Sequence, residues 1–453
     1  MVAELQSVEG LRKSFRGQLL FGADPGYEDA RRVQNGLIDR RPALIARCLG
    51  TSDVVAAVKF ARANSLDIAV RGGGHGVAGR AVCEGGLMID LSLMKRMDVD
   101  AKARTARAEA GLTWGEYNQV TQAHGLASTG GVVSTTGIAG LTLGGGLGWL
   151  MGAYGMAIDN LVGAEVVTAD GEVVRANDRE NIDLFWALRG GGGNFGVVSS
   201  FEFALHPVGP VVLSGLVAHP LESALAVLRF AREFAAAAPD KLTIECAFLR
   251  GPDSMPLVAV AVCHCGGLNE AENDVRALRA FGAPVMDTIG HQTYEATNTA
   301  MDAAFPKGAL NYWKSSFLRD DLSDGAIEIL ADRFAACPSA MTLMVLEHIH
   351  GAAARVPATA TAFPHRRVGW NVLLLSQWQD RSDSDVNIAW TRETYDLMEP
   401  VRAAASYVNY QADDAAAGEV SDAVWGQNYQ RLLRIKREYD PHNVFHLNQN
   451  IAP

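Results

Sequence analysis

The sequence has little that would cross-link the chain, anchor it in a membrane or attract a polyanion. Its 453 residues include only six cysteines and no CxxC pair, so neither a disulfide framework nor a structural zinc site is indicated. No run reaches about 18 uncharged apolar residues, and the first ten residues lack the basic start and apolar core of a secretion signal. Acidic side chains (51) outnumber basic ones (40), which disfavours binding to nucleic acid or an anionic membrane. We therefore expect a cytoplasmic protein with free, mostly buried thiols and no bound metal.

Glycine, in contrast, is abundant and concentrated in one part of the chain. The 46 glycines make up roughly a tenth of the residues, against about 7% in average usage, and 27 of them lie between Arg71 and Gly196. They form dense groups separated by short predicted strands: 72–74 with 76, 137 with 140, 144–146 with 148, and 190–193 with 196. Because glycine permits close approach of the backbone, these groups predict rigid loops and not a flexible linker.

The order of these loops and their neighbouring elements excludes the common dinucleotide-binding motif. A Rossmann fingerprint places G-x-G-x-x-G between a strand and a helix. Residues 71–76 (RGGGHG) follow a predicted strand at 66–70 but lead to another strand at 87–91, and the literal G-x-G-x-x-G at 191–196 follows a helix and precedes a strand. An NAD-dependent dehydrogenase is therefore disfavoured, and phosphate binding at 71–76 would depend on backbone N–H groups.

The distribution of predicted elements indicates an α+β protein. The chain starts with a predicted strand at 43–48, a helix at 51–63 and the strand at 66–70. Beyond residue 210, where the glycine groups have ended, we predict strands at 212–219, 241–249, 256–264, 343–350 and 368–378, and helices at 221–238, 268–282 and 383–403. A strand-rich second part favours an α+β architecture over alternating βαβ units.

Six segments of the chain resemble one known family from end to end. They are RPALIARC with SDVVAAVKFARANSLDIAVRGGGH, GVVSTTGIAGLTLGGGLGWL, YGMAIDNLVGAEVVTADGEVV, DLFWALRGGGGNFGVV, YVNYQADD and NYQRLLRIKREYDPHNVFHLNQNI. They are similar to the berberine-bridge-enzyme-like flavoproteins of the p-cresol methylhydroxylase (PCMH) and vanillyl-alcohol oxidase superfamily, among them bacterial 6-hydroxynicotine oxidases and secondary-metabolite oxidases. The resemblance implies a two-domain FAD-binding PCMH-type fold. Residues 1–210 and the C-terminal segment 405–453 would form a discontinuous flavin domain, and residues 211–404 a substrate domain with a central antiparallel sheet covered by helices.

The resemblance also implies how FAD is held. His75 stands where the family bonds a histidine ring nitrogen to the flavin 8α-methyl group. Val133 stands where many relatives carry a second, cysteine link, so a single covalent bond is expected. The full set of expected cofactor contacts is Arg71, Gly72, Gly73, Gly74, His75, Gly76, Thr136, Gly137, Gly140, Gly145, Gly148, Asn160, Val198 and Asn448.

Two further positions indicate the chemistry through the same resemblance. Thr136 stands where relatives control oxygen access to the flavin; because threonine leaves space there, we expect reoxidation by O2 with H2O2 as product. Tyr410 matches the catalytic base of several relatives, and a phenol with an ordinary pKa of about 10 needs a partner that stabilises its anion. The sequence does not identify that partner, and Arg366, Asp413 and Asp414 are candidates only for the electrostatics of the site. A plain core tyrosine in a strand YVNY is the alternative interpretation of Tyr410.

The substrate cavity is expected on the strand at 368–378 and its neighbours. Trp370, Trp378, Asn371 and Gln377 could line it, roughly half of them pointing instead to the covering helices, and His348 and His350 share one strand face. The sequence thus predicts an FAD-dependent oxidase that takes a hydride from an alcohol or amine carbon of a small organic substrate. A flavin dehydrogenase with another acceptor and a catalytically silent flavin-carrying protein are the alternatives. Sugar, alkaloid, terpenoid and polyketide substrates all stay open.

Overall fold

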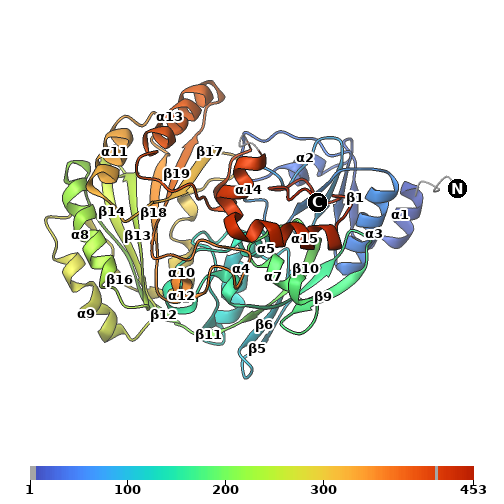
Figure 1. Cartoon of the computed structure of the whole chain (residues 1–453), viewed down its shortest axis with the longest axis horizontal. Helices are drawn as coiled ribbons and strands as arrows, with labels where there is room; N and C mark the ends of the chain where they lie inside the picture. The colour runs from blue at the N-terminus through green and yellow to red at the C-terminus, as the bar shows by residue number, and fades with distance from the viewer. Residues whose placement is uncertain (1–6, 414–416) are drawn as a thin grey trace.

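The computed structural model describes residues 7–413 and 417–453, which form two lobes (Figure 1). One lobe contains the glycine-rich first part of the chain, and the other is built on an eight-stranded sheet. The C-terminal helices α14 (Ala417–Trp425) and α15 (Tyr429–Tyr439) return to the first lobe. The mixture of helices and antiparallel sheets confirms the predicted α+β class.

The first sheet contains the strand–helix–strand unit that the sequence predicts. Strands β2 (Leu44–Arg47) and β3 (Ile68–Arg71) both pair in parallel with β4 (Leu87–Asp90), and β1 (Gln18–Leu20) adds an antiparallel edge. Helix α3 (Thr51–Ala63) makes the connection between β2 and β3, and one of its faces is buried. The first glycine group begins directly where β3 ends, so the sheet fixes the starting point of that loop.

The second sheet of this lobe is antiparallel throughout. Its order is β5 (Met97–Asp100), β6 (Thr105–Glu109), β10 (Val197–Ala204), β8 (Leu161–Val167) and β9 (Val173–Asn177). Helix α3 packs on β8 and β10, so the two sheets share one hydrophobic core. That shared core holds the glycine loops between fixed elements.

The second lobe is an antiparallel sheet whose four longest helices all lie on one face. The strand order is β15 (Met286–Asp287), β12 (Val211–Pro220), β14 (Pro256–His264), β13 (Leu242–Arg250), β18 (Leu343–Ile349), β19 (Gly369–Trp378) and β17 (Leu310–Phe317), and β16 (Gly290–Thr293) also pairs with β12. Helices α8 (Ala224–Ala236), α9 (Leu268–Arg279), α11 (Asp324–Ala335) and α13 (Ser384–Leu397) lie on the outer face (Figure 1). The other face of β13, β18, β19 and β17 is directed to the first lobe, where it lines a cavity.

Shorter elements connect these layers. They are α1 (Val8–Ser14), α2 (Tyr27–Arg31), α4 (Trp114–Gln122), β7 (Leu126–Ala127), α5 (Ile138–Gly144), α6 (Met151–Tyr154), α7 (Ile182–Leu188), β11 (His206–Pro207), α10 (Tyr294–Thr299) and α12 (Gly351–Arg355). Helix α5 begins directly after Gly137 of the second glycine group and ends at Gly144 of the third, and α7 precedes the fourth. Each of the four glycine groups therefore adjoins a regular element of the first lobe that fixes it in space.

The structure differs from the prediction at several points that matter for the site. The strand β17 and the helix α11 are not predicted, and the helix expected at 383–403 ends at Leu397. The segment YVNY is not a strand: Val408–Tyr410 form a 3-10 turn after Tyr407, whose hydroxyl accepts a hydrogen bond from the Gly146 N–H at 2.8 Å. This turn, and not a strand, therefore determines the direction of the Tyr410 side chain.

Candidate functional site

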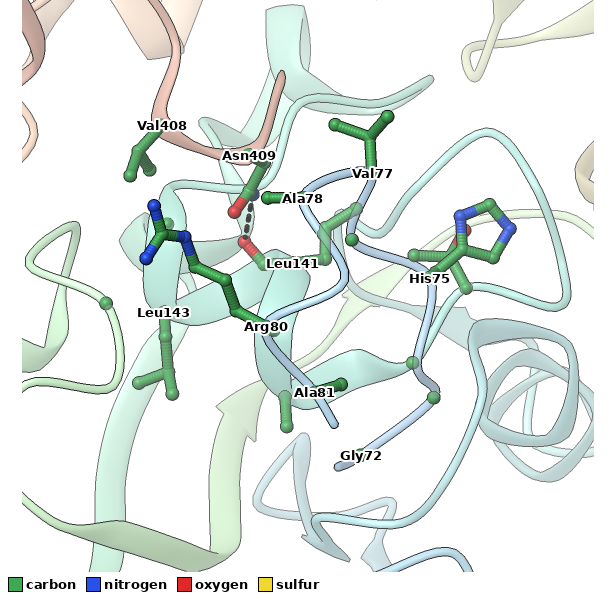
Figure 2. Close-up of a pocket in the computed structure, with 18 of the residues that line it drawn as sticks. Gly72, His75, Val77, Ala78, Arg80, Ala81, Leu141, Leu143, Val408 and Asn409 are labelled. Atoms are coloured by element: carbon green, nitrogen blue, oxygen red, sulfur yellow. Dashed lines mark hydrogen bonds between the residues drawn. The ribbon is translucent and has the colours of Figure 1, made fainter. Parts of the chain in front are cut away.

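A large cavity lies between the glycine loops of the first lobe and the uncovered sheet face of the second. It encloses about 2020 Å³ of space between protein atoms, its opening to solvent included. Figure 2 shows the loop with Gly72, His75 and Arg80 running along one wall, beside Asn409. The Asn409 side chain donates a hydrogen bond to the Leu141 carbonyl of α5 at 3.1 Å, which joins the C-terminal segment to that wall.

Two glycine loops cross at the base of this cavity. A Cβ atom added to Gly73 would lie 2.5 Å from the Gly137 nitrogen, so both positions require glycine for this close approach. At Gly76, Gly140 and Gly193, in contrast, an added Cβ would meet no protein atom within 4 Å. All three line the cavity, so the space beside their backbones belongs to whatever the cavity binds.

His75 lies half-buried in the same loop. Burial lowers the pKa of its imidazole to about 4, although Asp302 acts in the opposite direction, so the ring is neutral at pH 7. Its Nε2 lies 3.5 Å from the Thr135 hydroxyl, and its ring centroid lies 6.3 Å from that of Phe305. The buried Val133 lines the same cavity.

The structure brings most of the sequence-predicted residues together around this one cavity. Those that line it are Gly72, Gly73, Gly74, His75, Gly76, Thr136, Gly137, Gly140, Val198, Tyr410 and Asn448. They come from segments as far apart in the chain as Gly72 and Asn448. The C-terminal segment therefore contributes to the same space as the first glycine loop.

Four of the expected cofactor contacts lie elsewhere. The Arg71 guanidinium is paired with the buried Asp90 at 2.5 Å and also donates to the Ala30 carbonyl, so it joins strand ends and does not face the cavity. Gly145 ends α5 and packs near Phe363 and Tyr407, and Gly148 lies against the Gly130 carbonyl. The buried Asn160 side chain donates to the Tyr154 and Met156 carbonyls at 3.0 and 2.9 Å. In each case local packing already uses the residue.

The aromatic and histidine residues expected to line the substrate cavity also lie on the wrong face. In β18 and β19 the alternation of a strand directs Val345, Glu347, Leu373 and Leu375 to the cavity. The side chains at the alternate positions pack against the helices or against other side chains. Among these residues are Trp370, Trp378, His348 and His350. His348 stacks on Trp370 with ring centroids 4.6 Å apart. Of the two amides considered with them, Asn371 donates to Glu347, and Gln377 donates to the Ala304 carbonyl.

Tyr410 has a partner that the sequence did not identify. Its hydroxyl donates a hydrogen bond to Glu347 Oε1 at 2.8 Å, and Asn371 Nδ2 donates to Glu347 Oε2 at 2.6 Å. Burial, followed by the charge of Glu347, raises the pKa of Tyr410 well above its ordinary value. Burial also raises the pKa of Glu347 to about 7, against the opposing effect of these two hydrogen bonds. The shared proton of Tyr410 and Glu347 therefore stays on the phenol, and the Glu347 carboxyl group is the one that titrates near neutrality.

The three residues considered for the electrostatics of the site are placed elsewhere or lie outside the described residues. Arg366 pairs with Asp159 at 2.7 Å, and Asp413 pairs with Arg40 and Arg80 at 2.7 and 2.8 Å. Asp414 lies outside the described residues. Sequence reasoning also missed Glu245 and Glu347, although a signal was available: each is the single acidic residue of a mostly apolar predicted strand, a position where an unpaired carboxylate is rare.

The cavity fits a dinucleotide such as FAD in its polar lining. Arg80 Nε and Asn448 Oδ1 are buried and have no hydrogen-bond partner among the described residues, and both residues line the cavity. Together with the open space beside the three glycines, they provide unsatisfied donors and acceptors for a large polar ligand. Within residues 7–413 and 417–453, no three His, Cys, Asp or Glu side chains gather as a metal site. No helix in this described part combines the length and apolarity needed to cross a bilayer.

Comparison with known proteins identifies the family. The model of an FAD binding domain matches residues 42–177, and that named "Berberine and berberine like" matches residues 406–452. An (R)-6-hydroxynicotine oxidase of Paenarthrobacter nicotinovorans is 33% identical over 450 residues, which cover 97% of each chain. An FAD-linked oxidoreductase of Dictyostelium discoideum is 30% identical over 99% of this chain and 96% of its own.

The solved structures agree with this assignment. A 6-hydroxy-D-nicotine oxidase from Arthrobacter nicotinovorans superimposes with a TM-score of 0.90 at 30% identity and covers 99% of this chain and 100% of its own. The berberine-bridge-enzyme-like protein 1 of Physcomitrella patens has the same fold, with a TM-score of 0.89 at 21% identity over 99% of each chain. The chain therefore belongs to the berberine-bridge-enzyme-like FAD-linked oxidoreductases, and its fold is the two-domain FAD-binding fold of the PCMH type.

Proposed function

We propose that the protein is an oxidase that removes a hydride from an alcohol or amine carbon of a small organic substrate, with O2 as the final acceptor and H2O2 as product. The observation that carries the proposal is the 2.8 Å hydrogen bond from Tyr410 to Glu347 in a wall of the cavity that the glycine loops also line. The Tyr410–Glu347 pair can accept the substrate proton and lies beside the space that the cofactor would fill. The likeness to an (R)-6-hydroxynicotine oxidase supports an oxidase reaction on a small organic molecule.

The crossing glycine loops would hold FAD, together with Arg80, which follows the first loop, and Asn448 of the C-terminal segment. Bound FAD would supply the acceptor for the substrate hydride and the site of reaction with O2. His75 would bond covalently to it through a ring nitrogen, because a neutral imidazole has a free lone pair. Val133, at the position where many relatives carry a second linking cysteine, faces the cavity and has no thiol, so His75 would form the single covalent link.

Tyr410 and Glu347 would act together on the substrate proton. The raised pKa of Tyr410 makes a standing phenolate unfavourable, so the phenol oxygen accepts the substrate proton while its own proton moves to Glu347 Oε1. A carboxyl group with a pKa of about 7 is well matched to such a role at neutral pH. Asn371 holds the other oxygen of Glu347 and so orients the carboxylate toward Tyr410.

Thr136 would leave the oxygen path open. It is half-buried and lines the cavity next to Gly137. A threonine at this position leaves room that a leucine would fill. We expect a flavin reduced without air to reoxidise rapidly when air is admitted, and Thr136→Leu to slow that step.

The proposal is tested on the purified holoenzyme in two steps. Acid denaturation should leave the yellow colour on the wild-type polypeptide, whereas His75→Ala should release it. The control is Ser92→Ala, which changes a half-buried residue outside the cavity and should retain the colour like the wild type. Peroxide release is then screened over alcohols, sugars and amines. Rapid flavin reduction without peroxide would establish a dehydrogenase, and the absence of flavin reduction by every compound would overturn the proposed oxidase.

A further inference from the structure

A second carboxyl group lies directly beside Glu347. Glu245 on β13 is the register partner of Glu347 on β18 in the antiparallel pairing, and residues that face each other in this way have Cβ atoms about 4.5–5.5 Å apart. Both side chains line the cavity, and they are only 7% and 3% exposed. The uncovered sheet face therefore presents two adjacent carboxyl groups to the bound molecule.

The two carboxyl groups differ in how they are satisfied. Glu347 accepts hydrogen bonds from Tyr410 and Asn371 with its two oxygens. Glu245 Oε1 is buried and has no partner among the described residues. A buried carboxyl oxygen without a partner costs free energy, so a ligand that satisfied it would gain affinity from that contact.

Among the described residues that line the cavity, no free cation neutralises the two carboxyl groups. The other titratable groups that line the cavity are His75, which is neutral, and Arg80, whose guanidinium is paired with Asp413 and donates to the Asn448 carbonyl. The remaining neighbours are Tyr410, Tyr407 and Cys246, the residue after Glu245, which add no positive charge. Burial raises the pKa of both carboxyl groups, and the charge of Glu347 raises that of Glu245 further. Near neutral pH the pair therefore retains a proton, as two adjacent buried carboxyl groups do.

The rest of this wall is apolar and aromatic. The Trp313 ring stands edge-on to Tyr410 and to Phe305, with centroids 5.9 and 6.4 Å apart. Leu373 and Leu375 of β19 complete the surface. Aromatic rings beside carboxylates are the surroundings in which organic cations bind in proteins.

We propose that the site selects an amine, which binds as an organic cation with its nitrogen against Glu245 and Glu347 and its apolar body against Trp313 and the leucines. This inference rests on the proposed oxidase function and narrows it, because it excludes sugars and neutral alcohols as preferred substrates. Binding of the cation displaces the proton that the pair retains. The affinity for a permanent cation should therefore rise with pH through neutrality.

The test compares two probes of equal shape on the FAD-loaded enzyme. Benzyltrimethylammonium and its neutral carbon analogue neopentylbenzene are titrated while the flavin absorbance is recorded. The cation should bind at least tenfold more tightly, and calorimetry at pH 7 in buffers of different ionisation enthalpy should detect proton release. Glu245→Gln and Glu347→Gln should each reduce the preference at least tenfold, whereas Glu222→Gln, an exposed residue of the same lobe, should not. Flavin content and circular dichroism verify that the variants are folded.

The outcomes separate this inference from the proposed function. Equal affinity for the two probes, or an unchanged preference in both glutamine variants, overturns the amine assignment even if the enzyme releases peroxide from another substrate. Cation binding without any turnover supports the amine site and counts against the oxidase. Since the neutral probe has the same shape, poor shape complementarity cannot produce a difference between the two.

Discussion

A tyrosine is a weak base unless its proton has a place to go. In this protein Tyr410 is surrounded by apolar groups and donates its proton to Glu347, so the carboxyl group and not the phenol determines the pH at which the pair can accept a proton. The same carboxyl group faces Glu245 across the strands. At the scale of single residues, proton transfer and charge selection thus converge on Glu347.

The first prediction concerns this residue pair. Tyr410→Phe should retain FAD but reduce the rate of flavin reduction by substrate about 10²–10⁴-fold, the range for loss of a general base. Because Glu347 must be ionised to accept the proton, and its pKa lies at about 7, the wild-type rate should rise with pH through neutrality. Glu347→Gln should abolish that rise. Stopped-flow absorbance at several pH values measures both effects.

Phe317→Tyr is a suitable control for the first prediction, since it changes an aromatic residue of the same lobe that does not line the cavity. Its flavin should be reduced at the wild-type rate. A Tyr410→Phe enzyme with unchanged reduction and an unchanged pH profile would remove Tyr410 from proton transfer. An unchanged profile in Glu347→Gln alone would instead assign the titration to a different group.

At the scale of elements, the glycine loops have two separate tasks. Gly73 and Gly137 let two backbones cross, whereas Gly76, Gly140 and Gly193 leave space in the cavity itself. The sequence predicted tight loops but could not separate these tasks, because both require only the absence of a side chain. The distinction depends on which backbone lies opposite, and that is determined by the tertiary fold.

The second prediction follows from this distinction. Gly73→Ala would place a methyl group 2.5 Å from the Gly137 nitrogen, so the crossing must open and the free energy of unfolding should fall by about 1–3 kcal/mol, as for overpacked cores. Gly140→Ala meets no protein atom within 4 Å and should fold normally but bind FAD poorly. Thermal unfolding and the ratio of flavin to protein absorbance measure the two properties separately.

Gly22→Ala provides a matched control, because this glycine also meets no atom within 4 Å and does not line the cavity. It should alter neither stability nor flavin content. If Gly140→Ala retains a full complement of FAD, the space beside this glycine does not serve cofactor binding. If Gly73→Ala is as stable as the wild type, the loops do not cross as closely as described.

The strand pattern shows where sequence reasoning reached its limit. Strands β13, β14, β18 and β19 are predicted to within a residue or two, because buried strands produce long apolar runs. Apolar runs on both faces, however, hide which face meets the cavity, so Trp370 and His348 were predicted there although they pack toward the helices. The register between β13 and β18, which joins Glu245 to Glu347, has no counterpart in either strand's own sequence. A polar residue within such a run is the usable signal.

At the scale of the whole molecule, the cavity depends on the return of the C-terminal segment. The division into 1–210, 211–404 and 405–453 stays a prediction, but the contacts of the last segment show what it connects. Lys436 of α15 donates to Asp440 at 2.7 Å, to the Asn194 carbonyl at 2.8 Å and to the Phe445 carbonyl at 3.0 Å, with its side chain fully buried. One ammonium group thus joins the fourth glycine loop to the segment that carries Asn448.

The last prediction tests this tether. Lys436→Met leaves Asp440 as an unpaired buried charge, and breaking such a pair typically costs about 3–5 kcal/mol. We expect a clearly lower unfolding temperature. Flavin retention should also fall, because Phe445 and Asn448 line the cavity. The matched control is Arg437→Met, one residue further along the same helix and exposed, which should melt like the wild type. The double variant Lys436→Met/Asp440→Leu removes both charges and should recover part of the stability, since the cost arises from the unpaired carboxylate. If Lys436→Met melts at the wild-type temperature and retains its flavin, the C-terminal segment is held by its apolar contacts with α7 and not by this buried ion pair.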